Sequence, residues 1–197
     1  MRSANIDMTE LNRDDHRSEQ LTRYQSWLRC LARMEIDSRF QGKFSASDAV
    51  QQTMLAAWQD WDQFRGDSEA QRRAWLRQIL AHQLAKLARH FAGTQKRNVS
   101  RETSIEASLA QSSVRIENFL AAQQSSPSGQ AIANERSLVL AKVLEELPED
   151  YREVIVLRNL HDLSHEEVAQ RMKRSVGAVR MLWLRALSEL RSMIGEH

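Results

Sequence analysis

The stretch ELPEDYREVIVLRNLHDLSHEEVAQRMKRSVGAVRMLWLRALSELR, residues 146–191, decides the fold of the C-terminal part of this chain. Ser164, followed by Glu167 at the capping-box position, has the pattern of a helix start. After a short polar turn, Ser175 can cap a second helix, which carries one apolar stripe at helical spacing. The residues of the stripe are Val176, Val179, Trp183, Ala186, Leu187, Leu190 and Ile194. The sequence therefore predicts a helix-turn-helix, a unit whose second helix can enter the major groove of DNA.

Charge favours this DNA-binding interpretation over a helical hairpin buried in a core. Residues 135–170 hold 4 basic and 9 acidic side chains, whereas residues 171–191 hold 6 basic and 1 acidic. A basic second helix on an acidic scaffold suits a polyanion, because phosphate contacts dominate affinity for nucleic acid. A second basic zone, residues 65–101, holds 9 basic and 2 acidic side chains. Two basic zones separated by a polar stretch indicate two contacts along one extended polyanion.

The composition of the 197 residues points to an all-α protein. Gly (6) and Pro (2) are scarce, β-branched runs are few, and the helix formers Ala, Leu, Gln, Arg and Glu are frequent. Cys30 is the single cysteine, which excludes a disulfide framework and a cysteine-rich metal site. We see neither an apolar run long enough to cross a membrane nor a signal peptide, so we expect a cytoplasmic protein without a membrane partner.

The pattern along the chain predicts two small helical domains joined by a flexible linker. The first domain is expected at 18–92, the linker at 93–134, and the helix-turn-helix domain at 135–195. Within the first domain we expect a helix over 18–39, a second helix capped by Asp48, and a loop over 64–73 followed by an amphipathic helix. The linker is rich in Ser, Gln, Ala and Thr, with a weak helix expected around 113–122.

One flank of the amphipathic helix carries an aromatic ring, an amide, an imidazole and two cations. These residues are Trp75, Gln78, His82, Lys86 and Arg89. Single-stranded nucleic acid suits such a flank, because bases stack on rings and phosphates meet cations. The alternative is that Trp75 belongs to the core and the rest is solvated surface. A metal role for His82 is disfavoured, because no ligand-type residue stands at the right spacing.

Three stretches together resemble the bacterial extracytoplasmic-function (ECF) sigma factors, the small specificity subunits of RNA polymerase. DAVQQTMLAAWQDWDQFRGDS, residues 48–68, is similar to conserved region 2 of that family, and AWLRQILAHQLAKLARH, residues 74–90, to the part that reads the downstream promoter element. LPEDYREVIVLRNLHDLSHEEVAQRMKRSVGAVRMLWLRALSELR is similar to region 4, which reads the upstream element. The likeness covers these stretches in the family's order.

The resemblance implies a role for each stretch. The matching positions for docking on core RNA polymerase are Asp48, Gln51, Gln52 and Leu55. Those for capturing and melting the downstream promoter DNA are Phe64, Arg65, Gly66, Asp67, Ser68, Arg72, Arg73, Trp75, Gln78, His82, Lys86 and Arg89. Those for the upstream promoter element are Arg174, Ser175, Ala178, Arg180, Met181, Leu182 and Arg185. The resemblance also implies an anti-sigma factor as a regulatory partner, with no cofactor and no metal.

The chain departs from the family's pattern in both reading helices. Ala178, Met181, Leu182 and Leu184 stand where the family usually has Thr, Ser, Arg and His. Apolar groups cannot read hydrogen-bond patterns but can contact thymine methyls, so we expect an unusual upstream preference with more apolar and shape readout. The alternative is that Leu182 and Leu184 pack on the neighbouring helix. In the first domain, His82 and Lys86 replace the usual Asn and Asp, which puts the familiar downstream sequence in doubt.

Two other classes of function remain to be weighed against a transcription initiation factor. A helix-turn-helix transcriptional regulator with a separate helical sensor domain would explain the C-terminal half equally well, but it leaves the docking helix and the basic FRGDS region unexplained. An enzyme would need a phosphate-binding glycine loop, a metal triad or a nucleophile beside a base. The sequence shows none of these patterns, so we expect no catalytic residues.

Overall fold

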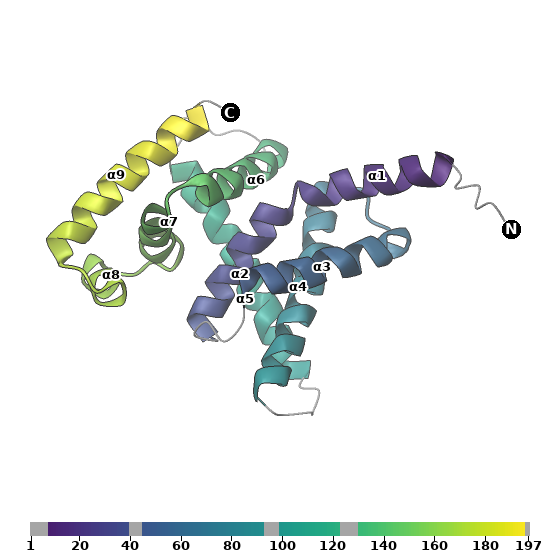
Figure 1. Ribbon diagram of the computed structural model, residues 1–197, viewed down its shortest axis with the longest axis horizontal. Coiled ribbons are helices and arrows are strands. Elements are labelled where there is room, and N and C mark those ends of the chain that lie inside the picture. Colours follow the sequence, from purple (N-terminus) through teal and green to yellow (C-terminus); the bar gives the residue numbers. More distant parts are fainter. Residues whose placement is uncertain (1–7, 40–44, 93–98, 123–129, 196–197) are drawn as a thin grey trace, which may run out of the picture.

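The computed structural model describes residues 8–39, 45–92, 99–122 and 130–195, and every regular element in these ranges is a helix (Figure 1). This confirms the all-α prediction. The α-helices are α1 (Met8–Thr22), α2 (Gln25–Arg39), α3 (Ala46–Gln59), α4 (Glu69–Ala92), α5 (Val99–Ala122), α6 (Gln130–Glu146), α7 (Glu149–Ile155), α8 (His165–Met172) and α9 (Val176–Gly195). A short 3-10 turn η1 (Trp61–Gln63) follows α3, and a π-turn η2 (Val156–Leu160) continues α7. None of the helices in the described ranges is long and apolar enough to cross a membrane.

The N-terminal unit is built on α2, α3 and α4, which pack on one another. The single helix expected over 18–39 is divided in two, because the backbone turns tightly at Tyr24, whose N–H donates to the carbonyl of Leu21 at 3.0 Å. The turn leaves the Tyr24 ring fully buried, and its hydroxyl donates to Glu69 Oε2 at 2.7 Å. The start of α4 is thereby tied to the start of α2.

The start of α3 and the length of the loop after it differ from the sequence expectation. Ser45, not Asp48, caps α3, because its side chain accepts from the backbone N–H of Ser47, and Asp48 lies in the first turn. The loop is shorter than 64–73, since α4 already begins at Glu69. Ser68 and Gln71 hold this helix start reciprocally: Gln71 N–H donates to Ser68 Oγ at 3.2 Å and Ser68 N–H donates to Gln71 Oε1 at 3.3 Å.

The segment that joins the two units carries the long helix α5, whereas the sequence indicated only a weak helix around 113–122. Its apolar residues recur at helical spacing and are buried against the rest of the core: Ile105, Leu109, Ile116, Phe119 and Leu120. The helix packs on α4, α2, α6 and η2. Its stability therefore comes from tertiary packing, which a low local helix propensity does not reveal.

The C-terminal unit consists of α6, α7 with η2, α8 and α9. Pro148 is the N-cap residue of α7. Proline is common at helix starts, because its fixed φ angle suits the helix and it has no N–H that would need a partner. The π-turn was not foreseen. It places Asn159 to accept from the Trp183 indole N–H of α9 at 2.9 Å, and the carbonyl of Leu160 to accept from Arg115 of α5 at 3.1 Å. Irregular helical turns of this kind commonly position side chains at functional regions.

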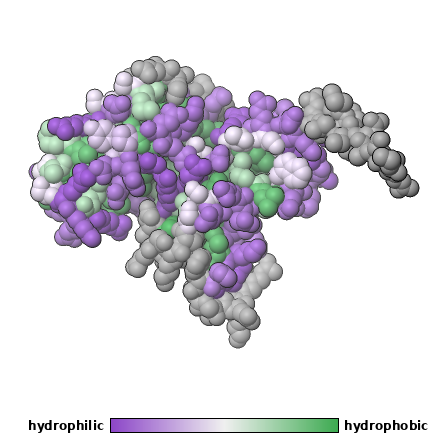
Figure 2. Space-filling view, viewed as in Figure 1, coloured by the Kyte–Doolittle hydropathy of each residue, from purple (hydrophilic) through white to green (hydrophobic). Residues whose placement is uncertain are grey.

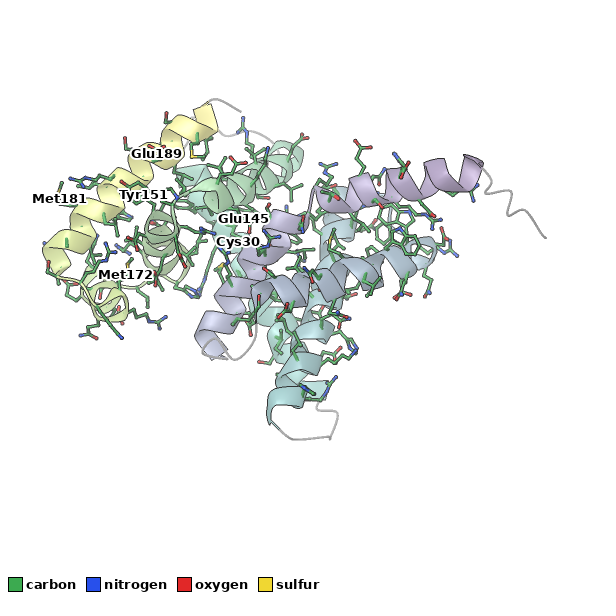
Figure 3. The ribbon with its side chains drawn as sticks, in the orientation of Figure 1. Cys30, Glu145, Tyr151, Met172, Met181 and Glu189 are labelled. Atoms are coloured by element: carbon green, nitrogen blue, oxygen red, sulfur yellow. The ribbon has the colours of Figure 1, made fainter. Side chains whose placement is uncertain are left out.

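The two units touch where α2 meets α6. Arg29 of α2 donates to Glu145 of α6 at 2.7 Å, and buried Cys30 lines the same small gap as Glu145 (Figure 3). Burial raises the pKa of the Cys30 thiol to about 12, with a smaller raising effect from Glu145 and a lowering effect from Arg33. The thiol is therefore protonated at neutral pH and acts as a small apolar side chain in this contact.

Candidate polymerase and nucleic-acid interfaces

The outward face of α3 is polar with two exposed apolar side chains. Ala49, Val50, Thr53 and Ala57 are buried on the opposite face. The residues predicted to dock on polymerase, Asp48, Gln51, Gln52 and Leu55, all lie on the exposed side. Leu55 is 51% exposed and Trp58 of the same helix is 38% exposed. The face is thus a continuous polar and apolar surface on one rigid helix, of the kind that protein partners bind. Trp58 was not among the predicted docking residues, but its exposure places it on the same face.

The loop between η1 and α4 is ordered by a cluster of aromatic rings. The Phe64 ring centroid lies 5.0 Å from that of Trp75, and the Trp61 ring lies 6.3 Å from Trp75 in an edge-to-face arrangement. The guanidinium of Arg72 lies 5.7 Å from the centroids of both Trp61 and Phe64. Trp75 is half-buried in this cluster, so it belongs partly to the core and partly to the surface.

Gly66 is the residue that lets the loop close over the Phe64 ring. A Cβ atom at this position would lie 2.4 Å from the end of that ring and 2.9 Å from Gln71 Cβ. Gln71 also accepts from the backbone N–H of Asp67 at 2.9 Å. The exposed tip of the loop is formed by Arg65, Asp67 and Ser68. The structure therefore brings the predicted residues 64–68, Arg72 and Trp75 together at one end of α4.

Arg73 departs from the expectation for a residue of a DNA-binding loop, because it is buried under α5. Its side chain is 1% exposed and forms an ion pair with Glu117 of α5 at 3.1 Å. It also donates to Ser113 Oγ at 3.3 Å, and its guanidinium lies 4.6 Å from the Trp27 ring centroid. Burial lowers the pKa of Arg73, and Glu117 opposes that shift. The sequence could not signal this, since the partner stands far away along the chain.

The remaining predicted residues of α4 lie farther along the helix. Gln78 and Lys86 are exposed, and Arg89 is half-buried. His82 Nδ1 lies 3.1 Å from Glu102 Oε1 of α5. Sequence reasoning found no carboxylate near His82, because Glu102 approaches only when α5 folds back along α4.

The helix-turn-helix forms as the sequence predicts. Ser164 and Glu167 make both bonds of the capping box, at 3.2 Å and 2.7 Å. The hydrogen bond from the Ser164 backbone N–H lowers the pKa of Glu167, with a smaller lowering effect from the Ser164 side chain, so that Glu167 stays an acceptor. Lys173 ends α8 in the left-handed conformation with φ 53°, which turns the chain toward α9. Ser175 then accepts from the backbone N–H of Ala178 at 3.2 Å, as the expected cap of the second helix.

The solvent side of α9 is a mixture of apolar and cationic side chains. Met181 is 52% exposed and points away from the other helices (Figure 3). Ala178 and Arg185 are also exposed, so the three residues share the face opposite the core stripe. Leu184 is 53% exposed, whereas Leu182 is half-buried and packs against the core. The sequence left open whether Leu182 and Leu184 pack on the neighbouring helix. In the structure Leu182 packs on the core, whereas Leu184 faces solvent.

Two arginines beside this face are tied to the acidic scaffold. Arg174 forms an ion pair with Asp150 of α7 at 2.6 Å, and Arg180 pairs with Glu166 of α8 at 3.3 Å. All four side chains are substantially exposed, so a polyanion can compete for the arginines at small cost. Asp150 and Glu166 were missed as site residues because only the fold places them beside the arginines. Hydrophilic residues dominate the visible face of the molecule, with scattered hydrophobic patches between them (Figure 2).

No cluster of three or more metal-ligating side chains occurs among the residues that the structure describes. The basic helix-turn-helix and the cluster of aromatic and cationic side chains at the start of α4 together define a helical DNA-binding protein. Residues 20–93 match the family Sigma-70 region 2, and residues 137–190 match the family Sigma-70, region 4.

Similar full-length proteins extend this match. The ECF RNA polymerase sigma-E factors of Escherichia coli (strain K12) and Salmonella typhimurium (strain LT2) are each 32% identical over 151 residues, covering 76% of this chain and 73% of the relative. Two solved structures overlap weakly in shape. One is the sigma factor RpoE in complex with the anti-sigma factor NepR from Bartonella quintana, with 20% identity, a TM-score of 0.32 and coverage of 90% and 95%. The other is the flagellar complex Sigma-28/FlgM, with 15% identity, a TM-score of 0.33 and coverage of 95% and 99%.

The chain belongs to the ECF RNA polymerase sigma factors. It is a DNA-binding transcription factor that directs initiation by RNA polymerase. The alternative of a regulator with an unrelated sensor domain is wrong, because the N-terminal half matches sigma region 2.

Proposed function

We propose that the exposed face of α3 is the surface by which this sigma factor docks on core RNA polymerase. The observation that carries the proposal is the exposure of Leu55 and Trp58 on a helix whose other face is buried. Two exposed apolar side chains with polar neighbours are typical of a partner-binding surface. Asp48 and Gln52 lie in the two turns before Leu55 on this face and supply polar contacts.

Size-exclusion chromatography with core polymerase tests the docking face. The wild-type chain should co-elute with core enzyme, and the double variant Asp48→Ala, Gln52→Ala should lose that co-elution. A matched control replaces exposed residues of the same kind elsewhere, Asp15→Ala and Gln111→Ala, and should co-elute as the wild type does. Co-elution of the docking variant at wild-type level would place the interface on another face.

In the second part of the proposal, the loop before α4 and the exposed flank of that helix hold the melted downstream element. The rings of Trp61, Phe64 and Trp75 lie together with Arg72 at the surface end of α4. A base flipped from the duplex can stack on such rings, a contact worth about 1–3 kcal/mol. The residues assigned to this interface are Phe64, Arg65, Gly66, Asp67, Ser68, Arg72, Trp75, Gln78, His82, Lys86 and Arg89.

The third part assigns the solvent face of α9 to the upstream promoter element. Ala178 and Met181 offer apolar contacts, for example to thymine methyls, while Arg174, Arg180 and Arg185 contact phosphates or bases. Ser175 stays as the helix cap, and Leu182 supports the helix from its half-buried position.

The upstream assignment predicts a promoter preference dominated by thymine methyls and groove shape. Run-off transcription from a library of upstream-element variants should favour thymine opposite Met181, and Met181→Ser should flatten that preference by about tenfold or less. Replacing exposed Ser188 by Ala serves as the control on the same helix. Equal transcription from all upstream variants would eliminate this assignment.

We also propose where the chain acts and how its activity is regulated. The chain acts in the cytoplasm with RNA polymerase, has no catalytic activity of its own, and is held inactive by an anti-sigma factor. Membership of the ECF family and the composition of the sequence support these statements.

A further inference from the structure

A cavity of about 420 Å³ lies where the end of α2 meets the C-terminal unit. Arg33 of α2 lines it from one side, and Arg152 of α7 and Arg171 of α8 line it from the other. Val156 and Leu157 of η2 complete an apolar part of its wall. Pockets for small molecules have volumes of about 300–1,000 Å³, so this cavity is large enough for such a ligand. None of the described residues that line it belongs to α3, α4 or α9, the helices of the proposed interfaces.

The cavity is lined by three arginines that come from three different helices. Arg33 and Arg152 are half-buried, whereas Arg171 is exposed in the last turn of α8. Among the residues that the structure describes, neither Arg33 nor Arg171 forms an ion pair. Arg152 donates to the Leu147 carbonyl at 3.2 Å, and its guanidinium has further N–H donors for a second acceptor. Guanidinium groups are well suited to bind phosphate, because their planar fork of donors matches two phosphate oxygens.

The positive charges of Arg33 and Arg152 repel each other. Burial lowers the pKa of Arg152, and Arg33 lowers it further, while Glu145 and Glu149 oppose these shifts. Glu145 lines the small gap that adjoins Arg33 and Arg152, but it is paired with Arg29 at 2.7 Å (Figure 3). An anion placed between Arg33 and Arg152 would be attracted by both guanidinium groups and would offset their repulsion.

The other lining side chains favour an organic phosphate over an inorganic anion. Val156 and Leu157 are 8% and 5% exposed, and they offer an apolar wall against which a ring can pack. Glu149 and Glu153 also line the cavity and are exposed. Their carboxylates can accept hydrogen bonds from hydroxyl or amino groups, and they repel a ligand that consists of phosphate alone. A nucleotide combines phosphate, hydroxyl groups and a ring in one molecule.

We propose that this cavity is a nucleotide-binding site, in which Arg33, Arg152 and Arg171 hold the phosphate groups of a nucleoside mono- or diphosphate. Val156 and Leu157 pack against the base, and Glu149 and Glu153 accept hydrogen bonds from the sugar hydroxyls or the base amino group. The site is separate from the proposed polymerase and DNA interfaces, so it does not depend on those assignments. Because the folded cavity binds the nucleotide, binding should raise the melting temperature of the chain.

Isothermal titration calorimetry of the full-length chain with ADP tests the site. ADP should bind with a Kd below about 1 mM, and adenosine, which has no phosphate, should not bind in that range. The double variant Arg33→Gln, Arg171→Gln should weaken ADP binding by about tenfold or more, because it removes charge-assisted contacts to phosphate. The control Arg13→Gln, Lys142→Gln removes the same charge from exposed positions outside the cavity and should stay within about twofold of the wild type.

A second comparison separates the cavity from the basic face of α9, which also attracts anions. The variant Arg180→Gln, Arg185→Gln removes two exposed cations of α9 and should bind ADP as the control does. Loss of ADP binding in this variant but not in the cavity variant would overturn the proposed site. Equal affinities for ADP and inorganic pyrophosphate would overturn the assignment of a nucleotide, because Val156 and Leu157 would then contribute nothing. A Kd above about 1 mM for both AMP and ADP would overturn the proposal as a whole.

A single variant guards against loss of folding, because Arg33 is half-buried whereas Arg171 is exposed. Arg171→Gln should keep the melting temperature of the ligand-free wild type and bind ADP about three- to tenfold more weakly. ADP should also slow hydrogen exchange of the η2 amides in the wild type. Unchanged ADP affinity in both Arg171→Gln and the double variant, or no slower exchange in η2, would contradict binding in this cavity.

Discussion

The two basic helices of this sigma factor, α4 and α9, hold their cations in opposite ways. On α4, Arg73 is buried against Glu117 of α5. On α9, Arg180 pairs with Glu166, and both side chains are 60% exposed. A surface pair of this kind costs little to separate, whereas a buried pair is costly to break.

The difference shows that equal basic charge in a sequence does not mean equal access to DNA. Residues 65–101 carry more basic side chains than residues 171–191. Among the residues of the first zone whose burial the structure describes, however, Arg73 is buried and Arg72, Arg77 and Arg89 are half-buried, whereas every basic side chain of the second zone is exposed. The helix proposed to read duplex DNA presents an exposed basic surface. On α4, Arg73 is covered by α5, whereas Gln78 and Lys86 of the proposed DNA-binding flank remain exposed.

The largest expected change in the free energy of unfolding comes from removing the carboxylate of the buried pair, compared with removing that of the exposed pair. Glu117→Ala leaves Arg73 buried without its ion-pair partner and should lower the free energy of unfolding by about 3 kcal/mol. Glu166→Ala acts on an exposed pair and should cost less than about 1 kcal/mol. Urea unfolding followed by tryptophan fluorescence measures both. Equal stability of the two variants would remove the contrast between α4 and α9.

A smaller change in stability is expected when one glycine near each of the two helices is replaced by alanine. Gly66→Ala should destabilise the chain by about 1–3 kcal/mol, because the new methyl group meets the Phe64 ring. Gly177→Ala should stabilise it by about 0.5–1 kcal/mol, because Gly177 lies in α9 with open space around it. Thermal unfolding should show a lower melting temperature for Gly66→Ala and a higher one for Gly177→Ala. A higher melting temperature for Gly66→Ala would show that the loop does not close tightly over the Phe64 ring.

The smallest expected effect is the contribution of His161, in the C-terminal unit, to the pH dependence of stability. Burial lowers the pKa of His161 below its usual 6.5, and Arg171 and Arg115 lower it further. The unfolded chain therefore binds more protons below about pH 6.5, so stability falls as the pH decreases through that range toward the folded pKa. The melting temperature should drop between about pH 7.5 and 5.5 by less in His161→Gln than in the wild type. An equal drop in both would assign the pH dependence to other groups.

The sequence predicted those parts of the fold that depend on neighbours along the chain. The capping box at Ser164, the cap at Ser175 and the apolar stripe of α9 are local patterns, and each is confirmed. Met181 is also exposed, as expected from its position opposite the apolar stripe of α9. Asp48 is exposed as well, but in the first turn of α3 rather than as its cap.

The features that the sequence did not predict depend on contacts between distant residues. Arg73 stood in a basic stretch that suggested a DNA contact, and only the return of α5 brings Glu117 to it. The composition of 93–134 suggested a linker, because its content of Ser, Gln, Ala and Thr outweighed the apolar spacing from Ile105 to Leu120, which the fold buries. The break at Tyr24 in a periodic helix was also not predicted; there the backbone turns and the Tyr24 hydroxyl donates to Glu69, a residue of another element.

Cys30 makes the chain convenient for site-specific labelling. It is the single cysteine, it is buried, and its thiol pKa of about 12 keeps the reactive thiolate scarce at neutral pH. Maleimide dyes should therefore leave it unmodified in the folded protein. A fluorophore pair on cysteines introduced at exposed Lys86 and Gln111 would then follow the distance between α4 and α5 during transcription initiation, without first replacing the native cysteine.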